Sequence, residues 1–213
     1  MVRSMRLLAA CAALVAVPAF GQNLVLNGSF ELPALGAGSW SVVPVPDWAP
    51  VSGSGVEVQN NVAGVPYAGS QHIELDGYDN SGIEQSVPVV PGGTYRLAWA
   101  YSPRPGVAQA SNPVDVLVDG AILLTNAADG TANANTAWTV HQAQLVAAGP
   151  AITLGFRAGG TSDGVGGYID DVSLTLVALP RAAAPVDASS NATLALMALA
   201  LAAAGVLALS RRG

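Results

Sequence analysis

The sequence contains no lysine and a single cysteine, and each scarcity excludes a class of chemistry. Cys11 lies in the first apolar stretch, so the chain beyond it forms neither a disulfide nor a thiol site. Between residues 22 and 180 only Arg96, Arg104 and Arg157 oppose thirteen Asp and Glu, a net charge of −10 (3 − 13). Nucleic-acid binding needs a basic footprint, so we expect no nucleic-acid partner. The acidic balance suits a divalent cation better, and a solvated acidic surface is the alternative.

Helical periodicity is also nearly absent between residues 22 and 180. Short runs rich in Val, Ile, Leu, Tyr and Trp alternate with clusters of Gly, Pro, Asn, Asp and Ser, which is typical of many short strands. A region of this length holds one domain with a real core. We expect strands at residues 23–26, 55–59, 71–75, 82–87, 94–101, 114–118, 121–124, 136–146, 151–158 and 168–177.

The pattern of side chains along these segments predicts the fold class. The Asp-Gly pair at 119–120, between two expected strands, predicts a hairpin with a two-residue turn. Alternation places Ile73 and Leu75 on one face of their strand and His72 and Glu74 on the other. The sequence therefore predicts an all-β sandwich, and its length favours a jelly roll of eight or more strands.

The first 21 residues have the layout of a secretory signal peptide. Arg3 and Arg6 precede an apolar run, and small residues stand just before Gln22, where we expect cleavage. Leu-Ala-Ala before Cys11 resembles a lipoprotein cleavage box, but the apolar run continues well past it. Ordinary signal-peptide cleavage is therefore the favoured interpretation.

A second apolar segment, residues 192–210, ends the chain. It is long enough to cross a bilayer as a transmembrane helix, and the basic tail 211–213 orients it. Residues 181–191 lack apolar periodicity and predict a linker. We thus expect domain 22–180 to be exported to the cell envelope, tethered at first to the inner membrane and later found at the cell surface or outside the cell.

Two short motifs open and close the expected domain, NLVLNGSFE at 23–31 and GYIDDVSL at 167–174. Together with three inner segments they resemble the exported β-sandwich domains of the choice-of-anchor C type. They are also similar to galactose-binding-like domains and to calcium-containing jelly-roll carbohydrate-binding modules. The resemblance covers residues 23–177 and implies a galactose-binding-like jelly roll. The inner segments are GSQHIELDG at 69–77, PGGTYRL at 91–97 and ITLGF at 152–156.

The resemblance also implies a structural calcium ion. In the jelly-roll relatives the opening Glu and the closing Asp share the ion, which makes Glu31 and Asp170 the candidate ligands and Asp171 the next. Calcium takes about six to eight oxygen ligands, so backbone carbonyls would supply the rest. The alternative is that these side chains only accept hydrogen bonds from backbone donors at turns and strand ends.

Glycan binding is the function that the aromatic residues favour. Sugar rings stack on aromatic faces, and aromatic residues in Gly- and Pro-rich surroundings are the ones expected at the surface. The alternative is that aromatic side chains of a small sandwich belong to the core, as we expect for Trp99 and Tyr101. The candidate glycan-binding residues are Trp48, Tyr67, Tyr78, Asp79, Asn80 and Glu84.

Catalysis has little support in the sequence, and we assign no catalytic residue. Only His72 and His141 are available as imidazole bases, and no nucleophile motif accompanies them. Glu74, Asp76 and Glu84 are the carboxylates that a glycosidase-like pair would use. Their separation is not given by the sequence, so a glycan-active hydrolase remains an alternative.

The C-terminal layout resembles a bacterial PEP-CTERM sorting signal, which an exosortase-like enzyme processes. Pro185, Val186 and Asp187 stand where the Pro–Glu–Pro motif is expected, and a plain tail anchor is the alternative. The sequence thus predicts an exported, non-catalytic surface or matrix protein that binds extracellular polysaccharide. The alternative from another class is an adhesive biofilm-matrix protein acting through protein contacts.

Overall fold

The computed structural model describes residues 21–181. The expected signal peptide up to residue 20, the linker beyond residue 181 and the expected membrane segment lie outside the described residues. Within 21–181, no helix is long and apolar enough to cross a membrane.

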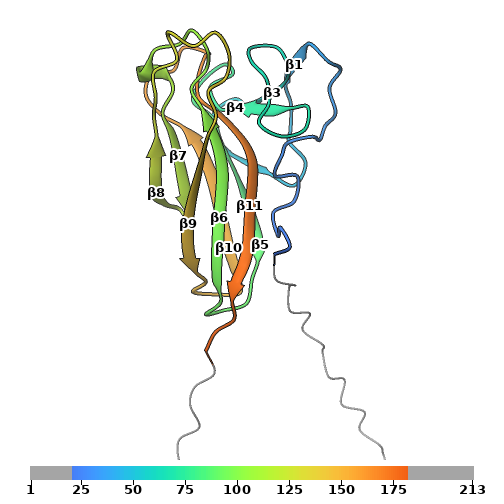
Figure 1. Cartoon of the computed structure of the whole chain (residues 1–213), viewed down its shortest axis with the longest axis vertical. Helices are drawn as coiled ribbons and strands as arrows, with labels where there is room; N and C mark the ends of the chain where they lie inside the picture. The colour runs from blue at the N-terminus through green and yellow to red at the C-terminus, as the bar shows by residue number, and fades with distance from the viewer. Residues whose placement is uncertain (1–20, 182–213) are drawn as a thin grey trace, which may run out of the picture. The chain divides into compact units, whose positions relative to one another are not determined.

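Eleven strands and one short 3₁₀ helix, η1, make up the regular structure of residues 21–181 (Figure 1). The strands are β1 (Ser39–Val42), β2 (Ala49–Ser52), β3 (Glu57–Asn60), β4 (His72–Glu74), β5 (Gly82–Pro88), β6 (Thr94–Ser102), β7 (Val114–Val118), β8 (Ala121–Asn126), β9 (Thr139–Val146), β10 (Ala151–Ala158) and β11 (Tyr168–Ala178), and η1 is Gln109–Ser111.

The strands form two antiparallel sheets. Sheet A has the order β1-β3-β4-β11-β6-β9, and sheet B has the order β2-β5-β10-β7-β8. The last strand, β11, is inserted between β4 and β6, and the strand before it, β10, is inserted between β5 and β7. Such returns over a long connection are Greek keys, and two of them across two sheets define a jelly roll. The predicted all-β jelly-roll sandwich is therefore confirmed.

Alternating side chains of the two sheets fill the core. Leu97 and Trp99 of β6 are buried together with Phe156 of β10 and Leu174 of β11. Tyr101 is buried as well, so the prediction that Trp99 and Tyr101 are core residues is confirmed.

The predicted hairpin is present, because β7 and β8 pair across a two-residue turn. Asp119 and Gly120 have φ values of 50° and 80°, the left-handed conformation that a primed turn requires. Strands β1 and β2 were not predicted; each is four residues long, and β2 contains Pro50. Segments this short give no measurable alternation.

The expected strand at 23–26 is not a strand, although it lies where a strand would. Asn23 forms one isolated bridge with Thr175 of β11. Its side-chain amide donates to the Val172 carbonyl (3.2 Å) and accepts from the Leu174 N–H (3.0 Å). The first and last motifs of the domain are thus side by side, but side-chain bonds replace part of the ladder.

Candidate functional site

Glu31, a predicted metal ligand, supports the β3–β4 loop (residues 61–71). Its Oε1 accepts hydrogen bonds from the backbone N–H groups of Ser70 (2.8 Å) and Gln71 (3.0 Å). Gly69 lies so close that a Cβ there would be 2.3 Å from the same oxygen, and its φ is +64°. Glycine at this position therefore permits the approach of the carboxylate to the loop.

Asp170, the second predicted ligand, supports the same loop from β11. Its Oδ2 accepts from the N–H groups of Tyr67 (2.8 Å) and Ala68 (2.9 Å), and its Oδ1 accepts from Asp171 N–H (2.7 Å). Burial raises the pKa of Asp170 to about 7, against the lowering effect of these N–H donors. Asp171 points to solvent. The structure thus brings Glu31 and Asp170 to one loop and leaves the Asp171 side chain apart.

The surroundings of these carboxylates fit calcium poorly. The groups that face Glu31 Oε1 and both oxygens of Asp170 are N–H donors, whereas calcium needs oxygen ligands. Among residues 21–181, no group of three or more His, Cys, Asp or Glu side chains is placed to hold a metal ion. The observed bonds favour the alternative in which both carboxylates cap backbone donors, and calcium stays a prediction of the resemblance.

We expect the full chain to have the same melting temperature in excess calcium and in excess chelator, because N–H donors already occupy these carboxylates. An ion that binds only the folded state at a hundredfold excess over its Kd would add about 2.7 kcal/mol. A shift of several degrees in differential scanning calorimetry would therefore restore the calcium assignment.

Trp48, a predicted glycan-binding residue, is a core residue instead. Its ring lies 5.6 Å from the ring of Phe30 and 5.9 Å from that of Phe156, measured between centroids. Its indole N–H donates to the Asn27 carbonyl (3.3 Å). Trp48 is only 4% exposed, so it presents no face on which a sugar can stack.

The other five predicted glycan-binding residues are divided among separate regions. Tyr67 lies exposed in the β3–β4 loop, over sheet A. Tyr78, Asp79 and Asn80 belong to the turn after β4, where the Asp79 carboxylate and the Asn80 amide bond neighbouring loops. Glu84 lies on β5, in sheet B. Asp79 and Asn80 therefore act as turn residues, and the five do not form one lining.

The β3–β4 loop covers an aromatic cluster on the outer face of sheet A that the sequence analysis did not single out. The His72 ring lies 4.5 Å from that of Tyr168 and 5.6 Å from that of Trp138. Trp138 donates its indole N–H to the Val65 carbonyl of the loop (2.8 Å). Neither ring nitrogen of His72 has a hydrogen-bond partner. Burial first, and then the charge of Arg104, lower the pKa of His72 to about 4, so the ring is neutral.

A buried carboxylate, Glu74, lies on the same outer face, opposite to the core residues Ile73 and Leu75, as the alternation along its strand predicted. It accepts hydrogen bonds from Gln59 Nε2 (2.7 Å), from Gly166 N–H (2.5 Å) and from the guanidinium of Arg104. Glu57 is its cross-strand neighbour. Burial raises the pKa of Glu74 to about 8, although Arg104 lowers it. Because Glu74 is completely buried, it is not accessible to a polysaccharide.

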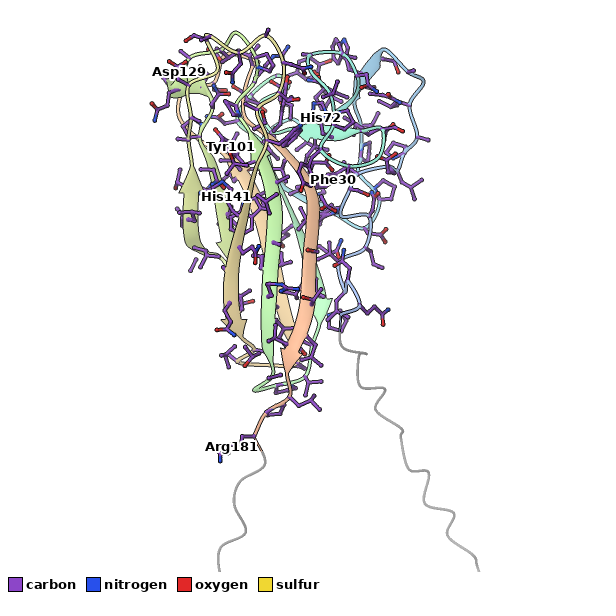
Figure 2. All side chains as sticks on the ribbon, viewed as in Figure 1. Phe30, His72, Tyr101, Asp129, His141 and Arg181 are labelled. Carbon is purple, nitrogen blue, oxygen red and sulfur yellow. The ribbon has the colours of Figure 1, made fainter. Side chains whose placement is uncertain are left out.

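An open groove of about 540 Å³ lies where the edge strands β8 and β9 meet the loops at one end of the sandwich. We call it the β8–β9 groove. Figure 2 labels three of its residues: Tyr101 on β6, His141 on β9, and Asp129 in the loop between β8 and β9. Its lining consists of Tyr101, Pro103, Leu124, Thr125, Asn126, Ala127, Ala128, Asp129, Asn133, Ala137, Thr139 and His141.

The ring of His141 and the amide of Asn126 form the inner part of the lining of the β8–β9 groove, its floor, and the buried Trp99 supports both. The half-buried His141 ring stacks on Trp99, with an interplanar angle of 16° and centroids 5.6 Å apart. Asn126 Oδ1 accepts from the Trp99 indole (2.9 Å), so the Asn126 amide nitrogen faces His141 Nε2 (3.0 Å) and donates to it. This bond fixes the imidazole with Nε2 as acceptor, and burial lowers the pKa of His141. The floor is therefore rigid and neutral.

The rim of the groove carries groups that bond hydroxyls. Thr139 supplies a hydroxyl, Asn133 an amide, and Asp129 a carboxylate, and Asp129 is the one ionisable acid in the lining. No Arg lines the groove. A neutral polar ligand of a few hundred Å³ fits this combination of volume and chemistry.

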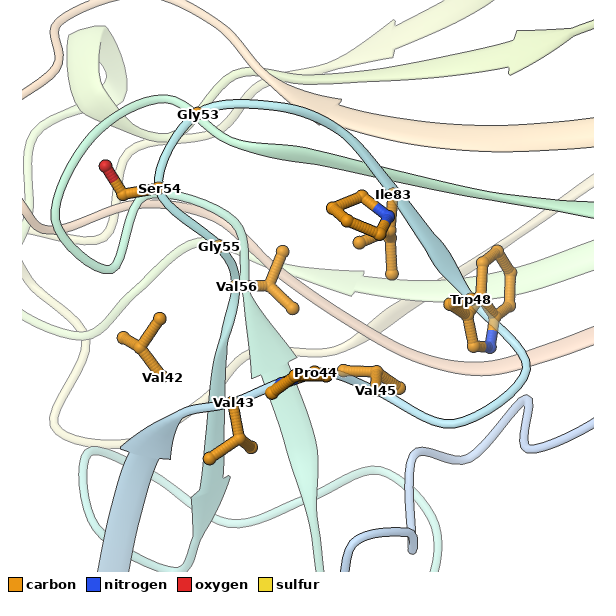
Figure 3. A pocket seen from close by; sticks show the side chains of 11 residues that line it. Val42, Val43, Pro44, Val45, Trp48, Gly53, Ser54, Gly55, Val56 and Ile83 are labelled. Carbon is orange, nitrogen blue, oxygen red and sulfur yellow. The ribbon is translucent and has the colours of Figure 1, made fainter.

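A second cavity, of about 280 Å³, has different chemistry (Figure 3). Its one side-chain hydroxyl, that of Ser54, already donates to Asp79 (2.8 Å). The cavity therefore lacks free side-chain groups for a sugar. It is lined by Val42, Val43, Pro44, Val45, Trp48, Pro50, Gly53, Ser54, Gly55, Val56 and Ile83.

Comparison with known proteins finds similar sequences and structures but assigns the chain to no family. No family model matches the chain. A multifunctional-autoprocessing repeats-in-toxin protein of Vibrio cholerae is 25% identical over 156 residues, which cover 72% of this chain. The chain spans 3% of the length of that curated relative.

Solved structures similar to this chain include carbohydrate-binding modules. TmCBM61 in complex with β-1,4-galactotriose is 20% identical, with a TM-score of 0.49 over 73% of this chain and 99% of that one. A family 35 module from Clostridium thermocellum is 19% identical (TM-score 0.42; 64% and 97%). An arabinose-bound α-L-arabinofuranosidase is 16% identical (TM-score 0.48; 74% and 27%).

Proposed function

We propose that this domain binds polysaccharide in the β8–β9 groove, without catalysis. The observation that carries the proposal is the half-buried imidazole of His141 at the floor of a polar, open groove, held in place by stacking on the buried Trp99. The face of a pyranose ring presents C–H groups to the flat imidazole, while its hydroxyls can form hydrogen bonds with the Asn133 amide and the Thr139 hydroxyl. A site built to bond hydroxyls rejects ligands that lack them.

We further propose that the domain works outside the cytoplasm. Supporting this are the two arginines and the apolar run of residues 1–21, and the apolar segment 192–210 with the arginines behind it. The tail would hold the domain at the envelope, or an exosortase-like enzyme would release it, near the polysaccharide that it binds.

Binding is tested with the purified full chain on a glycan array, followed by titration calorimetry with the best polysaccharide. His141→Ala removes the ring at the floor and should weaken binding at least about tenfold, equivalent to about 1.4 kcal/mol. Asn133→Ala keeps the backbone N–H that bonds Gly130 and removes only the rim amide, so we expect a smaller loss of affinity.

Ser86→Ala is the control, because Ser86 is exposed on β5 in sheet B and lies outside the lining of the groove. It should bind as the unaltered chain does. Unchanged affinity of His141→Ala, with an unchanged melting temperature, would move the site elsewhere. An array without any bound glycan would end the proposal, and release of reducing sugar would favour a hydrolase.

A further inference from the structure

The free edge of β9 is the longest uninterrupted strand edge of the sandwich among the described residues. β9 pairs with β6 over eight consecutive residues without a register shift, and no strand of residues 21–181 lies on its other side (Figure 1). The other edges are blunted. β1 and β2 have four residues each, β2 contains Pro50, and the ladders of β2 and β8 carry register shifts.

The β9 edge also lacks the charges that keep edges apart. Its eight residues include no Lys, Arg, Asp or Glu. Val140 and Val146 on its outer face are 45% and 68% exposed, and Gln142 and Gln144 between them are exposed too. A long, flat and uncharged edge offers its backbone N–H and C=O groups for pairing with another strand.

The order of residues along β9 indicates which strand pairs with it. Residues 140–146 read Val-His-Gln-Ala-Gln-Leu-Val, a sequence that is nearly symmetric about Ala143. We infer that β9 pairs antiparallel with β9 of a second copy, about a two-fold axis at Ala143. Val140 then faces Val146 of the second copy, and Gln142 faces Gln144 of the second copy. Each Gln–Gln pair can exchange amide hydrogen bonds, and each Val–Val pair buries exposed apolar surface.

A second copy suits this edge better than an unrelated strand. An antiparallel partner must match both faces of β9 in register, and the symmetric sequence supplies that match for a second copy without further requirement. On the inner face His141 lies opposite Leu145 of the second copy. The two-fold axis joins the six-stranded sheets A into one sheet and keeps both β8–β9 grooves on the same side.

The charge of the domain predicts how salt affects the association. Each copy carries a net charge of −10 between residues 22 and 180, so two copies repel each other at low ionic strength. Salt screens this repulsion but leaves the uncharged β9 contact unchanged. The interface is small, so we expect rapid exchange and a dimer that strengthens with protein concentration and with salt.

Sedimentation equilibrium of the full chain tests the inference over a range of concentration and salt. We expect a monomer–dimer equilibrium for the unaltered chain. Gln142→Glu/Gln144→Glu sets Glu against Glu twice across the axis and should abolish the dimer. Gln142→Lys/Gln144→Glu sets Lys against Glu at both places and should restore it. Both variants share Glu at 144, next to Arg96 of β6, which keeps the effect on folding similar.

Ser86→Glu/Thr161→Glu is the control for net charge, because it adds the same two charges at exposed positions away from β9. It should dimerise nearly as the unaltered chain does, and melting curves check that all variants fold. A monomer at every concentration and salt would overturn the inference. So would a dimer that both Gln142/Gln144 variants leave equally strong, or open-ended polymers in place of a closed dimer.

Discussion

Phe30→Ala is expected to lower the free energy of unfolding by about 3–5 kcal/mol, the usual cost of emptying a buried phenylalanine site. Phe30 is completely buried, and its ring packs on Trp48, which in turn packs on Phe156 of β10. The segment that contains Phe30 has no strand of its own, so this side chain is its main apolar anchor. Urea denaturation followed by tryptophan fluorescence measures the loss.

Leu26→Ala is the matched control in the same segment, because Leu26 is 60% exposed. Its effect should stay within about 0.5 kcal/mol. Equal, small effects of the two substitutions would mean that residues 23–31 do not dock against the sandwich in solution. The predicted difference would instead show that the NLVLNGSFE motif packs against the sandwich and holds the first and last parts of the domain together.

The strand pattern was predictable because it is local. The alternation of Leu97 and Trp99, or of Val172 and Leu174, reports burial on one face wherever a sheet has one side against the core. The Asp-Gly turn between β7 and β8 was predictable for the same reason, since two residues determine it. Once the strands were known, length and count favoured the jelly roll.

Burial by distant segments was not predictable from local pattern. His72 and Glu74 alternate with core residues as solvated side chains do, yet the β3–β4 loop and Arg104 cover them. Trp48 lies in a Pro-rich stretch that suggests a surface loop, but Phe30 and Phe156 enclose it.

The β8–β9 groove was missed for a related reason. Its residues come from β6, β8, β9 and the loops beside them, and no short motif unites them. In the sequence, His141 stands out only as one of two histidines, and no residue near it in the chain suggests a binding site. Its partners, Trp99 and Asn126, become neighbours only when the two sheets pack.

The stability of the domain is expected to fall as the pH rises from about 6.5 to about 8. Below pH 6.5 the unfolded chain binds a proton at His72, whose pKa in the folded chain is about 4, and this opposes the effect. Burial raises the pKa of Asp170 from 3.8 to about 7 and that of Glu74 from 4.5 to about 8. In this window the unfolded chain has lost both protons while the folded chain still holds a part of them, so each rise in pH favours the unfolded state. The stabilisation is complete below the unfolded pKa values and is lost through the folded ones. Each titrating group contributes about 1.4 kcal/mol per pH unit.

Glu74→Gln separates the contribution of Glu74 from the rest. The amide oxygen still accepts from Arg104, but the side chain no longer titrates, so the slope of stability against pH between about 7 and 8 should largely disappear. Asp170 has passed its own pKa there, and its contribution to the slope is small. The measurement is the urea midpoint at a series of pH values, with Gln142→Ala as a control that leaves the slope unchanged. If Glu74→Gln keeps the full slope, Glu74 is ionised throughout this range, and the Arg104 contact is an ion pair that outweighs the cost of burial.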